Sequence, residues 1–261
     1  MRIGATQLFF ANKSVAESLA YAKETGYESL ELCVSDTGAL RPDTDDAALR
    51  EMLGEAQRLG MAIPSLVPGM CSGFASPDPV VRANALEGLR KSVHIASVLG
   101  ADTILCHPGQ LIPQVRYDVM YTNVQAAMRA IEPDAKRAKV SVGVENVWNK
   151  FLLSPLEAKR FVAEVGSEYI GVYFDVGNFV PWAFPEHWIE ILDGAIKKVH
   201  FKDFRREGHE FVPLLEGDVD WPAVMKALRS VGYDSDVIQE VAGDEAGMKS
   251  TADAMRKIVA M

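Results

Sequence analysis

The sequence predicts an α/β protein with the fold of a (β/α)8 TIM barrel, formed by residues 1–261 as a single domain. Short apolar runs of the kind that form buried strands alternate eight times with segments of helical period. No proline- or serine-rich linker, low-complexity stretch or long charge run divides the 261 residues, a length that suits eight strand–helix units. A doubly wound open sheet is the alternative, but eight units without a break in composition favour closure.

The eight units follow one another in regular order. Strands are expected to begin near Ile3, Ser29, Met61, Thr103, Val140, Ile170, Lys198 and Asp236. Helices are expected over residues 14–24, 45–59, 80–99, 117–138, 155–165, 186–196, 221–231 and 245–259. Barrel strands are buried on both faces, which explains why these runs are apolar almost throughout and do not alternate with polar residues.

Local signals mark several helix ends. Ser154 precedes Pro155, and Glu157 follows, so one helix begins with an N-cap serine, a proline at its first position and a capping-box glutamate. Gly60 and Gly100 each come directly after a predicted helix and before the next strand, the position where glycine commonly ends a helix.

Composition and charge exclude several classes of function. The chain is 48% apolar and 24% charged with a net charge of −9, so a partner bound through phosphate neutralisation is not expected, and we predict no nucleic-acid partner. Cys33, Cys71 and Cys106 have no paired spacing, which argues against disulfides and a structural zinc site and favours buried or half-buried thiols. The N-terminus enters a strand directly, and no apolar run is long enough to cross a membrane, so we predict a cytoplasmic protein without a membrane partner.

Four side chains stand at the ends of the last four predicted strands: Glu145, Asp175, His200 and Glu240. A charge in an interior strand position is costly unless it is paired or bound to a metal ion. In barrels of this type, the carboxyl ends of the strands build the active site. A single strand-end carboxylate could simply cap a helix, but four such residues on successive strands converge on one mouth. Three carboxylates and one imidazole suit a divalent cation such as Mn²⁺ or Mg²⁺, with Co²⁺ or Zn²⁺ as alternatives.

Other polar residues are expected at the same mouth. His107 ends the fourth strand, Asn178 follows Asp175 closely, and Lys202 follows His200. We interpret these three as substrate-binding residues, because polar groups on neighbouring strand ends can meet adjacent hydroxyls. For His107, a purely structural role is the competing interpretation.

Several further residues admit two interpretations each. Glu31 lies inside the second strand and could orient a metal ligand or pair with a lysine. Trp148, Trp182 and Phe9 are candidate apolar walls for a sugar, although core packing explains them nearly as well. Arg205 and Arg206 could meet a phosphate, but a solvated loop is the simpler interpretation.

At these residues the sequence resembles the xylose-isomerase-like barrel superfamily, which includes sugar epimerases, isomerases and inosose-processing enzymes. The segments that carry the resemblance are Phe174-Asp-Val-Gly-Asn178, Val199-His-Phe-Lys-Asp203, Leu215-Glu-Gly-Asp-Val-Asp-Trp221, Leu228-Arg-Ser-Val-Gly-Tyr233 and Ile238-Gln-Glu240. They look most like the ketopentulose 5-phosphate 3-epimerase branch, which acts on L-ribulose or L-xylulose 5-phosphate. The ketohexose 3-epimerases are close relatives. The resemblance covers all eight units in outline.

The resemblance implies that Glu145, Asp175, His200 and Glu240 bind the metal and that Glu145 and Glu240 also act as the acid and base. The substrate would be a small ketose or its phosphate, epimerised at C3 through a metal-stabilised enediolate. Ketohexose 3-epimerases typically carry a histidine where this chain has Asn178, which favours the phosphate or acidic-sugar branches. A homo-oligomer is among the assemblies expected.

Other activities use nearly the same atoms. An aldose–ketose isomerase and a dehydratase acting on an inosose or keto-sugar both fit the same metal and base, and the fold does not decide between them. A non-catalytic sugar-binding barrel fits less well. A DNA-repair endonuclease of the same superfamily is disfavoured, since such enzymes use many histidines and this chain is acidic.

Overall fold

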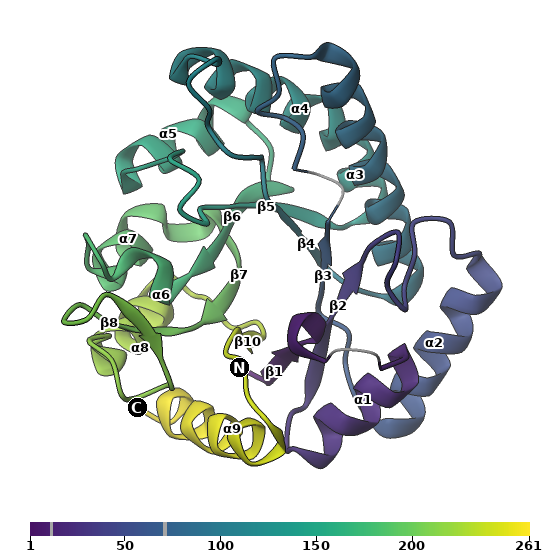
Figure 1. The fold of residues 1–261 in the computed structure, drawn as a ribbon, viewed down its shortest axis with the longest axis vertical. Coiled ribbons are helices and arrows are strands. Elements are labelled where there is room, and N and C mark those ends of the chain that lie inside the picture. The colour runs from purple at the N-terminus through teal and green to yellow at the C-terminus, as the bar shows by residue number, and fades with distance from the viewer. Residues whose placement is uncertain (11–12, 70–71) are drawn as a thin grey trace.

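Eight parallel strands close into a barrel in the order β1-β10-β7-β6-β5-β4-β3-β2, and helices form a ring around it (Figure 1). The computed structural model of the protein describes residues 1–10, 13–69 and 72–261; Cys71, expected to be at least half-buried, lies outside them. The barrel strands are β1 Ile3–Thr6, β2 Ser29–Val34, β3 Ser65–Pro68, β4 Thr103–Cys106, β5 Ser141–Glu145, β6 Ile170–Asp175, β7 Ile196–Phe201 and β10 Val237–Gln239. The predicted TIM barrel is confirmed.

The helices separate the strands along the chain and pack against the outside of the barrel. The α-helices are α1 Val15–Glu24, α2 Asp46–Leu59, α3 Pro79–Leu99, α4 Tyr117–Ala138, α5 Pro155–Val165, α6 Val176–Phe179, α7 Pro185–Leu192, α8 Trp221–Ser230 and α9 Glu245–Val259. The described residues also contain two 3₁₀ turns, η1 Gln7–Phe9 and η2 Asp193–Ala195. In the described part of the chain, no helix has the length and apolar character needed to cross a membrane.

The cap residues predicted from the sequence are confirmed at Ser154, Gly60 and Gly100, but the capping box predicted at Glu157 does not form. Ser154 accepts a hydrogen bond from the backbone N–H of Glu157 at the start of α5, although the Glu157 carboxylate accepts from the N–H of Leu153 and not from that of Ser154. Gly60 and Gly100 end α2 and α3 with φ values of 65° and 73°, which L-residues rarely adopt.

Two predicted boundaries are wrong. The third strand begins at Ser65 and not near Met61, because Ala62 makes only an isolated bridge to Ser29 and Pro64 has no N–H for a continuous ladder. The helix expected to run to residue 196 ends at Leu192, where Asp193 takes a positive φ of 54° and η2 follows. The seventh strand therefore starts at Ile196.

An antiparallel hairpin beyond the seventh strand was not predicted. It pairs β8 Asp203–Arg205 with β9 Glu210–Val212 beside α6 and α8 (Figure 1). The buried carboxylate of Asp203 anchors it. This carboxylate accepts hydrogen bonds from the N–H groups of Phe204, Leu215 and Val219 and from the indole of Trp221. One side chain thus joins two of the sequence segments that resemble the epimerases.

We expect Asp203→Ala to lower the midpoint of thermal unfolding by about 5–10 °C, because several buried donors would lose their acceptor. Glu216→Ala is the matched control, since Glu216 is exposed in the same loop and should change the midpoint little. Circular dichroism on both variants makes the comparison. Equal midpoints for the two variants would contradict the anchoring role.

Candidate functional site

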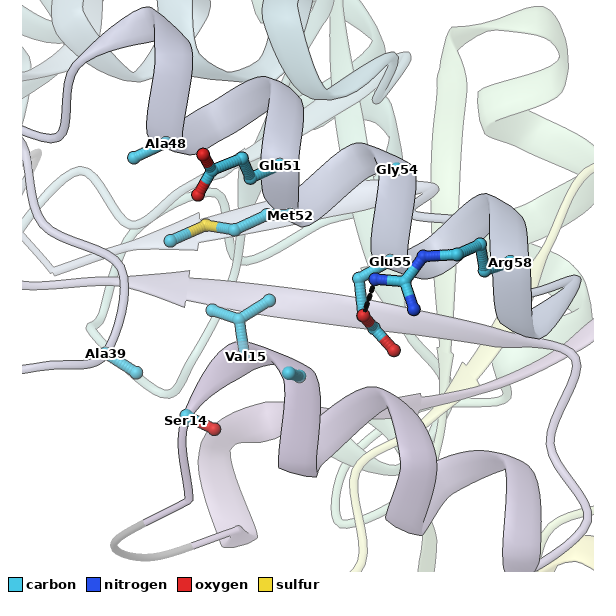
Figure 2. Close-up of a pocket in the computed structure, with 10 residues that line it drawn as sticks. Ser14, Val15, Ala39, Ala48, Glu51, Met52, Gly54, Glu55 and Arg58 are labelled. Carbon is cyan, nitrogen blue, oxygen red and sulfur yellow. Dashed lines mark hydrogen bonds and ion pairs between the residues drawn. The ribbon is translucent and has the colours of Figure 1, made fainter.

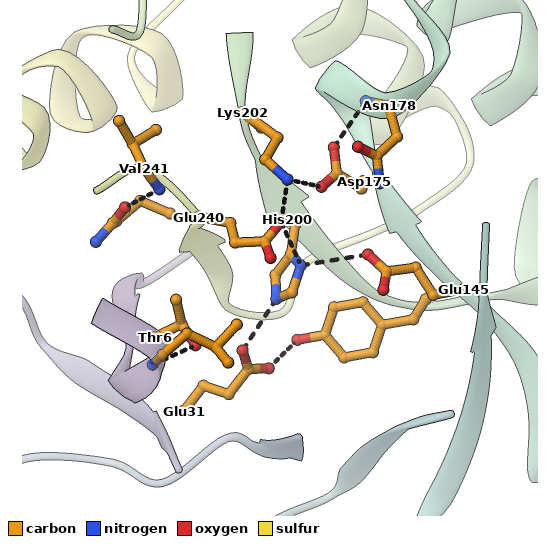
Figure 3. A network of polar contacts seen from close by, with 12 residues as sticks. Thr6, Glu31, Glu145, Asp175, Asn178, His200, Lys202, Glu240 and Val241 are labelled. Carbon is orange, nitrogen blue, oxygen red and sulfur yellow. Dashed lines mark hydrogen bonds and ion pairs between the residues drawn. The ribbon is translucent and has the colours of Figure 1, made fainter. Parts of the chain in front are cut away.

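Four ligand atoms meet at the carboxyl end of the barrel. Glu145, Asp175, His200 and Glu240 each offer one nitrogen or oxygen atom, and these atoms lie within 4.8 Å of one another. Glu145 and Asp175 end β5 and β6, His200 lies in β7, and Glu240 directly follows β10. Because β10, β7, β6 and β5 are neighbours in the barrel, successive strands deliver the four groups to one place (Figure 3).

A further buried carboxylate, that of Glu31, contacts the imidazole of His200. Glu31 of β2 lies 3.0 Å from Nε2 of His200 through its Oε1 atom. Its Oε2 atom accepts hydrogen bonds from Ser65 at 2.7 Å and from the hydroxyl of Tyr173. With Nε2 bound to Glu31, the other ring nitrogen, Nδ1, faces Glu145 and Glu240 (Figure 3).

Sequence reasoning considered Glu31 but missed Ser65 and Tyr173. Both residues are buried in strands whose other positions are almost all apolar, so they resemble packing residues. Their one signal is a hydroxyl in a fully buried strand, since such a group needs a hydrogen-bond partner.

Lys202 supplies positive charge among the carboxylates. Its ammonium group lies 3.3 Å from Oδ2 of Asp175 and 2.5 Å from Oε2 of Glu240. The side chain is mostly buried, so these ion pairs offset part of the cost of enclosing the two carboxylates. Lys202 also lies over the ring of Phe211, with Nζ 4.6 Å from the ring centroid.

Asn178 connects this site to the surrounding loops. Its N–H donates to Oδ1 of Asp175, which caps the short helix α6, and its side-chain amide donates to the carbonyl of Asn146 at 3.0 Å. Its own carbonyl accepts from the indole N–H of Trp148. The nitrogen of the Asn178 side chain, the group predicted to bind substrate, is thus bonded to the backbone carbonyl of the residue that follows Glu145.

The remaining predicted polar residues lie at the rim of the mouth. His107 directly follows β4 and is half-buried, and burial lowers the pKa of its imidazole. The guanidinium of Arg206 donates to the carbonyls of Val180 and Ala183, and that of Arg205 donates to the carbonyl of Glu216. Both guanidinium groups hold loops together through these bonds, so neither is free to bind a phosphate with all of its donors.

Burial and charge shift the proton affinities of the cluster. Burial raises the pKa of Glu145 to about 7 and that of Asp175 to about 6, although His200 and Lys202 respectively oppose these shifts. Burial would also raise the pKa of Glu240, but the charges of His200 and Lys202 outweigh it and lower that pKa. For His200, burial is outweighed by the charge of Glu31 and its neighbours, and the pKa lies well above its ordinary value.

The donor set fits a divalent cation. Among the described residues, Oε1 of Glu145 and Nδ1 of His200 are buried without a hydrogen-bond partner, and the 3.6 Å between them is too long for a hydrogen bond. Native proteins rarely leave such atoms unsatisfied. Three carboxylates and a neutral imidazole could hold a cation of the Mn²⁺ or Mg²⁺ class, which would compete with the His200 proton and the Lys202 ammonium.

A cavity on the outside of the barrel lacks this chemistry. It has a volume of about 650 Å³ and lies between α1 and α2 on the outside of the barrel (Figure 2). Val15 and Met52 form part of its wall, and two of its three charged residues, Glu55 and Arg58, pair with each other while Glu51 is the third. The strand ends do not reach this groove, so we place the functional site at the barrel mouth.

We expect the metal-free protein to lose stability as the pH rises from about 5 to about 7.5. The pKa of Glu145 is about 7 in the folded protein against 4.5 ordinarily, so the folded state binds this proton more tightly than the unfolded chain. The stabilising contribution of this proton is complete below the pKa of the unfolded chain, and it is lost as the pH rises past the pKa of the folded protein. Thermal midpoints in EDTA should therefore fall more steeply with pH for the wild type than for Glu145→Gln. Parallel curves would contradict the shifted pKa.

Comparison with known proteins agrees with this architecture. The L-ribulose-5-phosphate 3-epimerase UlaE of Salmonella paratyphi A is 26% identical over 230 residues, which cover 83% of this chain and 78% of that protein. The structure of D-psicose 3-epimerase with D-tagatose from Clostridium cellulolyticum H10 has a TM-score of 0.84 at 16% identity and covers 99% of each chain. A D-tagatose 3-epimerase-like protein has a TM-score of 0.85 at 19% identity, covering 100% of this chain and 97% of that one.

These structural likenesses show the fold. A family model, described as xylose isomerase-like TIM barrel, matches residues 19–258. That match spans nearly all of the described barrel, from α1 to α9. The chain belongs to the xylose isomerase-like TIM barrel family.

Proposed function

We propose that the protein is a metal-dependent epimerase that inverts C3 of a small ketose or ketose phosphate. The observation that carries this proposal is that Glu145 and Glu240 approach His200 from two sides. One ligand atom from each of these residues and from Asp175 lies within 4.8 Å of the others. The relatives named as 3-epimerases of ketoses or their phosphates support it. One divalent cation, Mn²⁺ or Mg²⁺ with Co²⁺ or Zn²⁺ as alternatives, would bind to Glu145, Asp175, His200 and Glu240.

Inversion at C3 needs two proton-transferring groups on opposite faces of the substrate. Glu145 comes from β5 and Glu240 from the end of β10, with β6 and β7 between them in the barrel. We assign one carboxylate to remove the C3 proton and the other to return a proton to the opposite face, with the roles exchanged in the reverse direction. The bound cation would stabilise the negative charge that develops on the substrate oxygens.

The neighbouring residues would position this pair. Glu31 fixes the ring of His200 through Nε2, so Nδ1 keeps its direction toward the carboxylates. We propose that Lys202, His107 and Asn178 contact the substrate, Lys202 by donating to a hydroxyl or developing oxyanion. For Asn178, its side-chain oxygen is the contacting atom, because its amide nitrogen is bonded to Asn146.

We predict that Glu145→Gln and Glu240→Gln each reduce C3 exchange at least about 100-fold while the protein stays folded. Asp175→Asn should instead weaken metal binding first, because the proposal gives Asp175 no proton to transfer. The measurement is incorporation of deuterium at C3, followed by NMR, over a panel of ketoses and ketose phosphates in deuterium oxide. Glu207→Gln is the control, since Glu207 is an exposed carboxylate in the β8–β9 turn.

Wild-type exchange by either glutamine variant with metal bound would refute the two-carboxylate mechanism. Turnover without C3 exchange, with loss of water from the substrate, would instead indicate a dehydratase.

We also predict that Glu31→Gln weakens Mn²⁺ binding by about 10–100-fold, because the imidazole of His200 would lose the charged partner that orients it. Ser65→Ala is the matched control. It removes one hydrogen bond from the far oxygen of Glu31 and leaves the bond to His200 in place, so its effect should be much smaller. Calorimetric titration at one fixed pH compares the three proteins. Equal affinities for wild type and Glu31→Gln would show that Glu31 does not support the site.

A further inference from the structure

A mostly apolar cavity of about 390 Å³ opens beside the proposed active site. Asn146, Trp148, Lys150, Leu153 and Trp182 line it. Its volume falls in the range of small-molecule sites, about 300–1,000 Å³. None of these five residues belongs to the cluster of metal-ligand atoms described above.

The cavity lies next to the metal-ligand cluster, because Asn146 of its wall directly follows Glu145. Lys202, which pairs with Asp175 and Glu240, lies over the ring of Phe211. Phe211 in turn stacks on Trp148, with ring centroids 5.2 Å apart and planes 22° from parallel. Trp148 therefore belongs both to the wall of the cavity and to the aromatic contacts beside Lys202.

The two indoles form adjoining walls. Trp148 and Trp182 have ring centroids 5.7 Å apart, and their planes meet at 57°. Trp182 is half exposed, at 50% of its full surface, and Leu153 is similarly exposed at 54%. Exposed indole faces bind flat, uncharged rings, including the apolar faces of sugars, because dispersion and C–H contacts replace poorly held water.

The loop that carries Trp148 is held in a strained conformation. Trp148, Lys150 and Leu152 have φ values of 62°, 61° and 52°, a region that non-glycine residues rarely adopt. The side chain of Asn146 fixes the loop by donating to the carbonyls of Phe151 and Leu152 and accepting from the N–H of Trp148. Such conformations persist where surrounding contacts enforce them and are concentrated at ligand-binding sites.

The charges around the cavity suit an uncharged occupant. Arg205 and Arg206 are bonded to backbone carbonyls, and Lys202 is paired with two carboxylates. Among the lining residues, Lys150 alone carries a positive charge. A phosphate would normally be held by several donors, as in a backbone cradle or an arginine pair. One ammonium beside two indoles is better matched to a hydroxyl-bearing ring.

We propose that this cavity is a subsite for a second, uncharged sugar ring, joined to the ketose at the end remote from C3. This proposal rests on the proposed function, since the ketose itself would occupy the metal-ligand cluster. It makes the preferred substrate class a glycosylated ketose, with Trp182 stacking on the second ring and Lys150 meeting its hydroxyls.

The probe is isomaltulose, in which a glucose unit is attached to O6 of fructose. Saturation-transfer NMR with the metal-loaded protein should transfer magnetisation to the glucose ring as strongly as to the ketose. In parallel, kcat/KM for C3 exchange should be higher for isomaltulose than for fructose. Trp182→Ala should reduce that ratio about fivefold, the size expected for one aromatic contact. Phe184→Ala is the control, because Phe184 is equally exposed nearby but does not line the cavity.

Saturation confined to the ketose, or equal ratios in the two variants, would overturn the subsite. The two proposals fail separately. Exchange on fructose without contact to the glucose ring rejects the subsite and keeps the epimerase, whereas strong contact to the glucose ring without exchange on any ketose supports the subsite and rejects the epimerase.

Discussion

The hydrogen bond between Glu31 and His200 is the contact on which the site depends. It joins β2 to β7 through the interior of the barrel and fixes which imidazole nitrogen faces the mouth. Both residues are fully buried, so neither could be retained without a partner. Ser65 and Tyr173 bond to the same carboxylate, and the four residues form one buried hydrogen-bonded network inside the barrel.

At the mouth, next to this network, carboxylates outnumber the positively charged groups. Glu145, Asp175 and Glu240 come together at a place where His200 and Lys202 supply the nearby positive charge. The raised pKa values of Glu145 and Asp175 express the resulting cost, because burial favours their neutral forms. A divalent cation would offset that cost and would contact the atoms of Glu145 and His200 that have no hydrogen-bond partner among the described residues, so the electrostatics and the proposed chemistry would both be served by the same ligand.

Much of the barrel could be predicted from the sequence because its strands are short, apolar and regularly spaced. Glu145, Asp175, His200 and Glu240 were recognisable as polar residues that end such strands. The role of Asp203 was not, because its four donors come from up to 18 residues away and no local pattern signals them. The β8–β9 hairpin was missed for a similar reason, since its segment is polar and lacks a regular period. The partners of Lys202 depend on how β6 and β10 flank β7 in the barrel, which the spacing of residues along the chain does not specify.

The mouth thus has two parts. One is the hydrogen-bonded network of Glu31, Ser65 and Tyr173 that orients the imidazole of His200, and the other is the strained loop that carries Trp148. The proposed chemistry depends on the binding of one cation by the cluster through Nδ1 of His200. A crystal structure of the protein grown with Mn²⁺, with an anomalous difference map, tests it most directly. We predict a single manganese peak within bonding distance of Glu145, Asp175, Nδ1 of His200 and Glu240, while Nε2 still donates to Glu31. A peak elsewhere, or no peak at this cluster, would contradict the account.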